Sequence, residues 1–426
     1  MPETSPTARA NLFAPCPRGL EQLLADELGA LGADDCRTVA SGVAFSGDRR
    51  LAYAANLHSR LASRVLVEVA RRRYRNDDDL YRLAAGVDWE TRFDPDLTLR
   101  VDTSAIRSPV RSLNFATLRV KDAIVDRLRD RTGRRPSIDT RQPDVRVWLF
   151  LEARDATLYL DLSGEPLFKR GWRSEREDRG DAPLKENLAA GLLVLAGWTP
   201  ATPLVDPFCG SGTIAIEAAS IAHDLAPGLS RSFGFERLLD HDPALWSSLR
   251  AAAIRRAQAG AATPARIAGS DVDAAAVARA RRNLARAGLP ESAVRWAVGD
   301  LARIGPPFET PGFVVTNPPY GERIAARHEQ AGDRDDALPS QRRRHGDATP
   351  ARRPDRPSHR ADRHEATMQA IGEAFRRDWP GWQVWMLSSD PALPAQLGMK
   401  ARRRTPLYNG AIECRLFGFE VFSREP

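Results

Sequence analysis

A short apolar run that ends in an acid and continues through a glycine-rich turn into a helix constrains the fold of this chain most. The run covers residues 204–206, the turn reads Asp206-Pro-Phe-Cys-Gly-Ser-Gly-Thr, and apolar residues of helical length follow over 214–222. A strand, a tight glycine turn and a helix in this order typically open a doubly wound parallel sheet. The sequence therefore predicts an α/β, Rossmann-like fold with a ligand crevice at this turn.

The glycine turn does not by itself identify the ligand. Gly210 and Gly212 let the backbone approach a bound molecule closely, which nicotinamide and flavin sites also require. No Gly-Lys-Ser or Gly-Lys-Thr follows, so the turn is not a phosphate-binding P-loop. The class of cofactor has to come from the strands that follow.

Two later strands are expected to end in acids. Residues 267–271 end at Asp271 and lead into a helix over 274–287. An acid at the end of the second strand is placed to accept hydrogen bonds from ribose hydroxyls, whereas Asp273 is more typical of an N-cap. Asp300 ends a further strand and could accept the adenine amine, although a cap or loop acid is an equally good interpretation.

The next strand, residues 313–316, leads into Asn317, Pro318, Pro319 and Tyr320. The carboxyl end of a parallel strand faces the ligand crevice. The Asn317 side-chain carbonyl, and a backbone carbonyl that the prolines keep out of helical pairing, can accept both hydrogens of a planar amine. Tyr320 offers a face on which an extruded base can stack. With the cofactor-type signals, this motif indicates chemistry on an exocyclic amine.

The chain before about residue 164 alternates short strands and helices in an α+β pattern. Its basic residues gather in three groups, at 71–75, 107–121 and 127–135. Such groups are the electrostatic footprint of an RNA-binding surface, although a solvated face is the plainer interpretation. The polar residues from 168 to 183 indicate a connection between domains.

Composition narrows the class of protein further. The net charge of +7 favours a polyanionic partner, and the spacing of the four cysteines predicts neither a metal site nor a disulfide framework. No export signal or apolar membrane-length run is found, so a cytoplasmic protein without membrane contact is expected. Residues 327–365 contain one large aliphatic residue, Leu338, which predicts a disordered insertion.

These motifs resemble those of class I S-adenosylmethionine-dependent methyltransferases that act on exocyclic amines. The resemblance covers nearly the whole chain except the N-terminal tip and the insertion. Four further segments are similar to the bacterial RlmL-type 23S rRNA guanine-N2 methyltransferases: Arg18-Gly-Leu-Glu, Lys169-Arg-Gly-Trp-Arg, Ala182-Pro-Leu-Lys-Glu-Asn and Leu407-Tyr-Asn-Gly-Ala-Ile-Glu-Cys.

The resemblance implies a ferredoxin-like segment over 1–60, a THUMP RNA-binding domain over 61–165, a linker over 166–183 and a methyltransferase domain over 184–426 that ends in an antiparallel strand. It implies S-adenosylmethionine as the cofactor, with contacts from Asp206, Pro207, Cys209, Gly210, Gly212, Thr213, Asp271, Asp300 and Asn317. The amine and base would be held by Asn317, Pro318, Pro319 and Tyr320, and the product would be 2-methylguanosine in 23S rRNA.

Three alternatives stay open at this point. Adenine-N6 methyltransferases use the same Asn-Pro-Pro-Tyr chemistry, but the THUMP-like first half and the expectation of RNA rather than DNA argue against them. A tRNA guanine-N2 methyltransferase would share both halves of the chain. A noncatalytic RNA-binding factor in ribosome assembly could retain the pocket, although the intact motif residues disfavour it. The sequence does not determine the oligomeric state.

Overall fold

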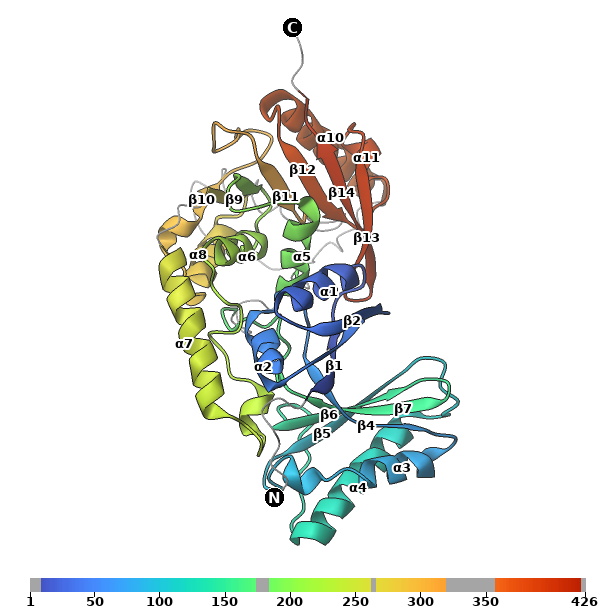
Figure 1. Cartoon of the computed structure of the whole chain (residues 1–426). Helices are drawn as coiled ribbons and strands as arrows, with labels where there is room; N and C mark the ends of the chain where they lie inside the picture. The colour runs from blue at the N-terminus through green and yellow to red at the C-terminus, as the bar shows by residue number, and fades with distance from the viewer. Residues whose placement is uncertain (1–8, 174–183, 262–265, 319–356, 423–426) are drawn as a thin grey trace, which may run out of the picture. The chain divides into compact units, whose positions relative to one another are not determined.

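The structure is a computed structural model that describes residues 9–173, 184–261, 266–318 and 357–422 (Figure 1). The described chain forms two compact units. The first unit comprises described residues of 1–177, 185–191 and 223–262, and the second comprises those of 178–184, 192–222 and 263–426. The chain therefore leaves the second unit after the helix at 213–222 and returns to it at the strand that begins at Ile267.

The first unit contains a seven-stranded sheet in the order β2-β3-β1-β4-β7-β6-β5. Its strands are β1 (Ala10–Pro15), β2 (Asp34–Val39), β3 (Gly42–Gly47), β4 (Leu66–Arg73), β5 (Leu99–Ala105), β6 (Val145–Leu151) and β7 (Asp155–Asp161). Its helices include α1 (Glu21–Ala30), α2 (Arg49–His58), α3 (Asp77–Ala85), α4 (Leu113–Thr132) and α7 (Pro243–Gly260). Strict alternation of buried and half-buried residues along β6 shows that one sheet face is packed. The expected α+β character is confirmed.

The first strand pair of the first unit includes one strand without an apolar pattern. β2 ends at Val39, and β3 begins at Gly42 and runs antiparallel to it. Ser41 in the turn adopts a φ of +63°. The sequence pattern missed β2 because its residues are mostly exposed and show no apolar alternation.

The predicted linker over 166–183 also needs correction. Leu167, Arg170 and Trp172 are buried, so residues 166–173 pack into the first unit. The Arg170 guanidinium donates hydrogen bonds to the backbone carbonyls of Leu167 and Arg60, both at 2.7 Å. Polar composition was misleading here because a buried arginine is tolerated where carbonyl oxygens satisfy it. Residues 174–183 lie outside the described part of the chain.

One segment of the expected methyltransferase domain packs in the first compact unit. Residues 223–262 contribute α7 and an aromatic cluster that packs on Tyr53. Phe235 stacks on the Tyr53 ring at 4.0 Å between centroids, Phe233 stacks on Phe235 at 5.4 Å, and the Trp246 ring meets Phe235 edge-on at 5.1 Å. The Tyr53–Phe235 contact joins residues 182 positions apart, so no local pattern could place it.

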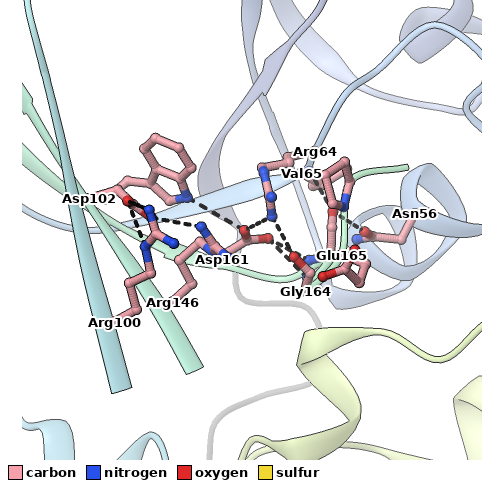
Figure 2. Close-up of polar contacts among 12 residues, drawn as sticks. Asn56, Arg64, Val65, Arg100, Asp102, Arg146, Asp161, Gly164 and Glu165 are labelled. Atoms are coloured by element: carbon pink, nitrogen blue, oxygen red, sulfur yellow. Dashed lines mark hydrogen bonds and ion pairs between the residues drawn. The ribbon is translucent and has the colours of Figure 1, made fainter. Parts of the chain in front are cut away.

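A buried ion pair holds the chain beside β4 and β7. The Asp161 carboxylate, whose side chain is 0% exposed, pairs with Arg64 (Figure 2). Its other oxygen accepts hydrogen bonds from the backbone N–H groups of Ser163 (2.8 Å) and Gly164 (3.2 Å). The Arg64 guanidinium lies 5.7 Å from the centre of the Trp148 ring. A buried charge is tolerated only when it is paired, so this cluster fixes the chain path here.

The second unit contains another seven-stranded sheet, in the order β10-β9-β8-β11-β12-β14-β13. Its strands are β8 (Leu204–Asp206), β9 (Ile267–Asp271), β10 (Arg295–Val298), β11 (Phe313–Thr316), β12 (Gln383–Ser388), β13 (Arg403–Asn409) and β14 (Ile412–Glu420). The helices are α6 (Thr213–Ala222), α8 (Ala274–Arg286), α10 (Pro357–Asp378) and α11 (Leu393–Gln396), and α5 (Glu186–Ala196) spans both units. Five strands run parallel and β14 is antiparallel to β12. This confirms the doubly wound sheet and its antiparallel strand near the C-terminus.

The predicted insertion over 327–365 is wrong at its end. α10 begins at Pro357, so residues 357–365 are helical. The later part of α10 buries Met368, Ile371 and Phe375 in the core of the second unit. A helix anchored by buried residues can continue over a polar stretch, because tertiary packing overrides weak local propensity, which composition alone does not reveal. Residues 327–356 lie outside the described part of the chain.

Among the helices that the structure describes, none is both long and apolar enough to cross a bilayer.

Candidate active site

The candidate site lies along the carboxyl edge of the parallel strands in the second unit. Val205 pairs with both Ala268 of β9 and Val314 of β11, so the ends of β8, β9 and β11 are neighbours. Asp206, Asp271 and Thr316 are the last residues of these strands, and Asn317 follows directly. The motifs identified in the sequence therefore meet at the edge where doubly wound sheets bind ligands.

The glycine turn after β8 combines one packed and one open glycine. Gly212 has a φ of +87°, and a Cβ there would lie 2.9 Å from both the Ala280 Cβ and the Trp296 ring. Gly210 has a φ of +53°, and a Cβ there would meet no atom within 4 Å. Both positions therefore favour glycine, Gly212 also because it packs against α8 and β10, whereas Gly210 leaves open space in which a ligand could contact the backbone.

The turn is held from its base by β9. The Cys209 N–H donates to the Ser270 carbonyl at 2.9 Å, and the Gly212 N–H donates to the Cys209 carbonyl at 2.7 Å. Cys209 is buried, as is Pro207, and Thr213 begins α6 with 5% exposure. These three residues therefore shape the turn, and their predicted contacts with the cofactor stay predictions.

Asp271 is tied to the glycine turn. One of its carboxylate oxygens accepts a hydrogen bond from the Gly210 N–H at 3.0 Å, and the other accepts one from the Asp273 N–H at 3.1 Å. Asp271 therefore fixes the glycine turn against the end of β9. The contact that we expected with ribose stays a prediction.

Asp206 is a buried carboxyl group between two strands. It is 2% exposed and accepts hydrogen bonds from the Thr316 hydroxyl (2.6 Å) and the Phe208 N–H (3.3 Å). Burial, and to a smaller extent the charge of Asp271, raises the pKa of Asp206 to about 7 against the lowering effect of these hydrogen bonds. Asp206 therefore positions the turn relative to β11 and can gain or lose a proton near neutral pH.

This raised pKa predicts a pH-dependent stability of the second unit. In the unfolded chain an Asp carboxyl has a pKa of about 3.9, so the folded state binds the Asp206 proton more tightly. That stabilisation is present below about pH 4 and is lost as the pH rises through 7. Urea unfolding measures the prediction. As the pH rises from about 5 to 8, the free energy of unfolding of the wild type should fall by a few kcal/mol relative to that of Asp206→Asn. Parallel pH profiles for the two proteins would contradict this assignment.

The remaining two carboxylates accept hydrogen bonds from nearby backbone N–H groups. The Asp273 side chain accepts from the Ala275 N–H at 2.9 Å and caps α8, as expected. Asp300 accepts from the Ala302 N–H at 3.0 Å in a turn, which matches the loop-acid interpretation. It is half-buried and follows Gly299, whose N–H donates to the Asp271 carbonyl, so it lies beside the end of β9. Its predicted contact with adenine stays a prediction.

The structure describes only half of the amine-holding motif. Asn317 is half-buried and Pro318 is buried, directly after the fully buried Thr316. Pro319 and Tyr320 lie outside the described residues. The structure thus places the Asn317 side of the motif beside the glycine turn and leaves the stacking role of Tyr320 as a prediction.

Two residues of the site escaped the sequence analysis. Thr316 donates to Asp206, and the Trp296 ring occupies the space beside Gly212 and Gly269, where a Cβ at Gly269 would approach it to 2.5 Å. Trp296 is 27 positions from Gly269, and Thr316 is 110 positions from Asp206. These contacts depend on the order of the strands in the sheet, so no local motif predicts them.

Comparisons with known proteins find matches in three segments of the chain. Residues 11–66 match the RlmL ferredoxin-like domain, residues 74–161 match the THUMP domain, and residues 173–332 match the RMKL-like methyltransferase domain. In all three segments the chain is similar to RlmL-type THUMP-containing methyltransferases. The resemblance noted in the sequence and the predicted fold class are thereby confirmed.

Curated members of the RlmL-type family match nearly the whole chain. Ribosomal RNA large subunit methyltransferase K/L of Syntrophotalea carbinolica is 39% identical over 97% of this chain and 54% of its own length. The protein of the same name from Pseudomonas aeruginosa is 39% identical over 97% and 53%, respectively. The chain thus spans about half the length of these relatives.

Solved structures share the architecture of both units. A protein described as a methyltransferase and solved with SAH bound is 28% identical, with a TM-score of 0.79 over 98% of this chain and 99% of that one. A predicted N6-adenine-specific DNA methylase from Listeria monocytogenes is also 28% identical, with a TM-score of 0.79 over 97% of each chain. TrmN from Thermus thermophilus has a TM-score of 0.64 at 22% identity, over 97% of this chain and 100% of its own, and shows the fold alone.

Proposed function

We propose that this protein transfers the methyl group of S-adenosylmethionine to the exocyclic N2 amine of a guanosine in 23S rRNA. The observation that carries the proposal is that Asn317 follows β11 at the same sheet edge as the open Gly210 turn and Asp271. An acceptor for an amine and a nucleoside-type cofactor site are thus neighbours. In-line methyl transfer requires this kind of proximity.

The residues present fit the cofactor. The open space at Gly210 admits a close approach to the backbone, and the buried Asp206 could accept from a ligand ammonium once it loses its proton. Asp271 would accept from the ribose and Asp300 from the adenine amine, with Pro207, Cys209, Gly212 and Thr213 shaping the turn. S-Adenosylmethionine supplies an activated methyl group on a sulfonium.

The protein's task in this reaction is to position the amine. A guanine amine is a poor nucleophile because its lone pair is delocalised into the ring. Hydrogen bonds to the Asn317 side-chain oxygen and the Pro318 carbonyl would hold the amine with the lone pair aimed at the methyl carbon. The amine nitrogen would displace the neutral thioether from the methyl carbon, and one amine proton would pass to solvent. Pro319 would keep the turn rigid and Tyr320 would stack on the base.

Ribosomal RNA as the substrate is supported by the relatives and the first unit. The curated proteins are named for methylation of large-subunit ribosomal RNA, and residues 74–161 match the THUMP domain. We therefore infer that the protein binds RNA in the cytoplasm, and that the first unit supplies much of the affinity. The net charge of +7 suits a polyanionic substrate.

One alternative has an observation of its own. The Listeria monocytogenes structure carries a name that specifies adenine N6, and the amine of adenine could be held by the same acceptors. The match to the THUMP domain favours RNA over DNA as the substrate.

The test of substrate uses purified protein and labelled S-adenosylmethionine with protein-free 23S rRNA and, separately, bulk tRNA. We expect label in the 23S rRNA and none in the tRNA. Label in tRNA alone would overturn the rRNA assignment while keeping the methyltransferase activity. Absence of label from both RNAs and from a large-subunit precursor would favour a noncatalytic assembly factor.

A further inference from the structure

The basic residues of the first unit differ in how far acidic side chains neutralise them. The group at 127–135 is largely neutralised, because Arg127 pairs with Glu90 at 2.8 Å, Arg129 with Asp126 at 3.0 Å, and Arg134 with Asp96 at 2.8 Å. Five other arginines are exposed and form no side-chain hydrogen bond or ion pair with the part of the chain that the structure describes. They are Arg72, Arg73, Arg107, Arg111 and Arg154. These five, which we call the basic edge, remain available for a partner.

Strand register gathers the basic edge at one end of the sheet. Arg72 of β4 pairs with Ala156 of β7, which pairs with Leu151 of β6, which in turn pairs with Ala105 of β5. These four strands span about 14 Å at the usual spacing of 4.8 Å. Arg73 ends β4, Arg154 lies between β6 and β7, and Arg107 and Arg111 follow β5. Arginines distant in sequence therefore share this edge.

A hydrogen-bonded tyrosine fixes the connection between β5 and α4 at this edge. The buried Tyr74, which follows β4, donates its hydroxyl to the Glu152 carbonyl (2.8 Å) and lies 2.7 Å from the Ser108 hydroxyl. The Tyr74 N–H donates to the Arg154 carbonyl at 3.0 Å. Arg107 in this connection adopts a φ of +55°, a left-handed backbone conformation that is strained for a residue with a side chain and that clusters at binding sites.

Beside the basic edge lie four exposed apolar side chains, which we call the apolar corner. Ile106 is 48% exposed, Leu113 40%, Phe115 49% and Leu118 43%. A hydrogen bond of 2.6 Å between the Thr103 and Thr117 hydroxyls holds the first turns of α4 against β5. Of the three on α4, Phe115 and Leu118 are three positions apart and therefore lie on one face of the helix. Exposed apolar residues on one face, close in sequence to unpaired arginines, favour an interaction site over ordinary surface.

We propose that the basic edge and the apolar corner together bind unpaired nucleotides of the RNA substrate. The arginines would neutralise backbone phosphates, and the exposed Phe115 ring would stack on an unpaired base, with Leu118 on the same face of α4. In an A-form duplex the base faces are hidden by neighbouring bases, so an apolar corner has nothing to contact. The inference deepens the proposed function, because it rests on RNA as the substrate and names the form of RNA that the first unit takes.

Binding of a fluorescent, unstructured oligoribonucleotide of about 16 nucleotides, and of the duplex of the same sequence, tests this proposal. Phe115→Ala should weaken binding of the unstructured RNA about tenfold with an unchanged salt dependence, because stacking releases no counterions. Arg107→Ala/Arg111→Ala should also weaken binding and should lower the slope of log K against log salt by about 1.4. All substituted side chains are exposed, so the fold should persist.

The matched control is Arg129→Ala/Arg131→Ala, which removes the same charge from the same domain at the other end of α4. It should leave the affinity and the salt slope close to wild type, because these arginines already pair with acids. The proposal would be overturned if the control weakened RNA binding as much as the test variants, or if Phe115→Ala had no effect on affinity. It would also be overturned if the protein bound the duplex more tightly than the unstructured RNA, or bound anionic vesicles in place of RNA. If the variants bind like the wild type while methylated RNA still forms, the surface is wrong and the proposed function stands. If binding weakens as expected but the wild type methylates no RNA, the RNA-binding surface stands and the proposed function is wrong.

Discussion

Replacing Asn317 by alanine is expected to lower kcat for methyl transfer by about 100- to 1,000-fold while the affinities for S-adenosylmethionine and RNA change little. Asn317 follows β11 beside the glycine turn, and in the proposed mechanism its side-chain oxygen holds an amine hydrogen at the moment of transfer. Removing one such preorganised group in other enzymes has an effect of this size. Single-turnover kinetics with separate binding measurements for cofactor and RNA distinguish the two effects.

A conservative variant and a control sharpen this test. Asn317→Asp keeps an acceptor oxygen and should therefore lose less activity than Asn317→Ala. Asn11→Ala, which changes an exposed asparagine in β1 of the first unit, should behave like the wild type. A parallel loss of cofactor binding and turnover in Asn317→Ala would contradict the amine-holding role and assign Asn317 to cofactor binding instead.

Replacing Asp161 by alanine is expected to destabilise the first unit by about 3–5 kcal/mol. The substitution leaves the buried Arg64 guanidinium without its carboxylate and removes the acceptor for the Ser163 and Gly164 N–H groups. An unpaired buried charge is the main reason for the large expected effect, since net energies of intact buried pairs are small. Urea unfolding followed by tryptophan fluorescence measures the change, and Trp148 lies close enough to Arg64 to report it.

The control for Asp161 is an exposed ion pair in the same unit. Asp78 pairs with Arg119 at 2.7 Å, but its side chain is 68% exposed. Asp78→Ala should therefore change the free energy of unfolding by less than about 1 kcal/mol. Similar effects for the two substitutions would mean that the Arg64–Asp161 pair does not anchor the chain as we infer.

Local motifs made much of the second unit predictable from sequence. The strand, glycine turn and helix around Gly210 involve consecutive residues, and strand ends such as Asp271 and Thr316 follow from short apolar runs. Because carboxyl ends of adjacent parallel strands meet at one edge, the sequence also indicated that these motifs would converge. Asp273 was correctly interpreted as a cap for the same reason, since capping depends on neighbours in sequence.

Long-range packing explains what the sequence could not reveal. The segment at 223–262 joins the first unit through the stacking of Phe235 on Tyr53, two residues whose proximity no periodicity encodes. Arginine-rich stretches looked alike in sequence, yet Arg127 is neutralised by Glu90 whereas Arg107 forms no ion pair with the described residues. The protonation of Asp206 near neutral pH likewise depends on burial that only the assembled sheet produces.

The most direct test of the central claim is nucleoside analysis of 23S rRNA after incubation with S-adenosylmethionine and either the wild-type protein or Asn317→Ala. The account predicts that the wild type adds 2-methylguanosine and that the variant adds almost none while still binding the RNA. Methyl groups on adenine N6, or 2-methylguanosine formed equally by both proteins, would contradict it.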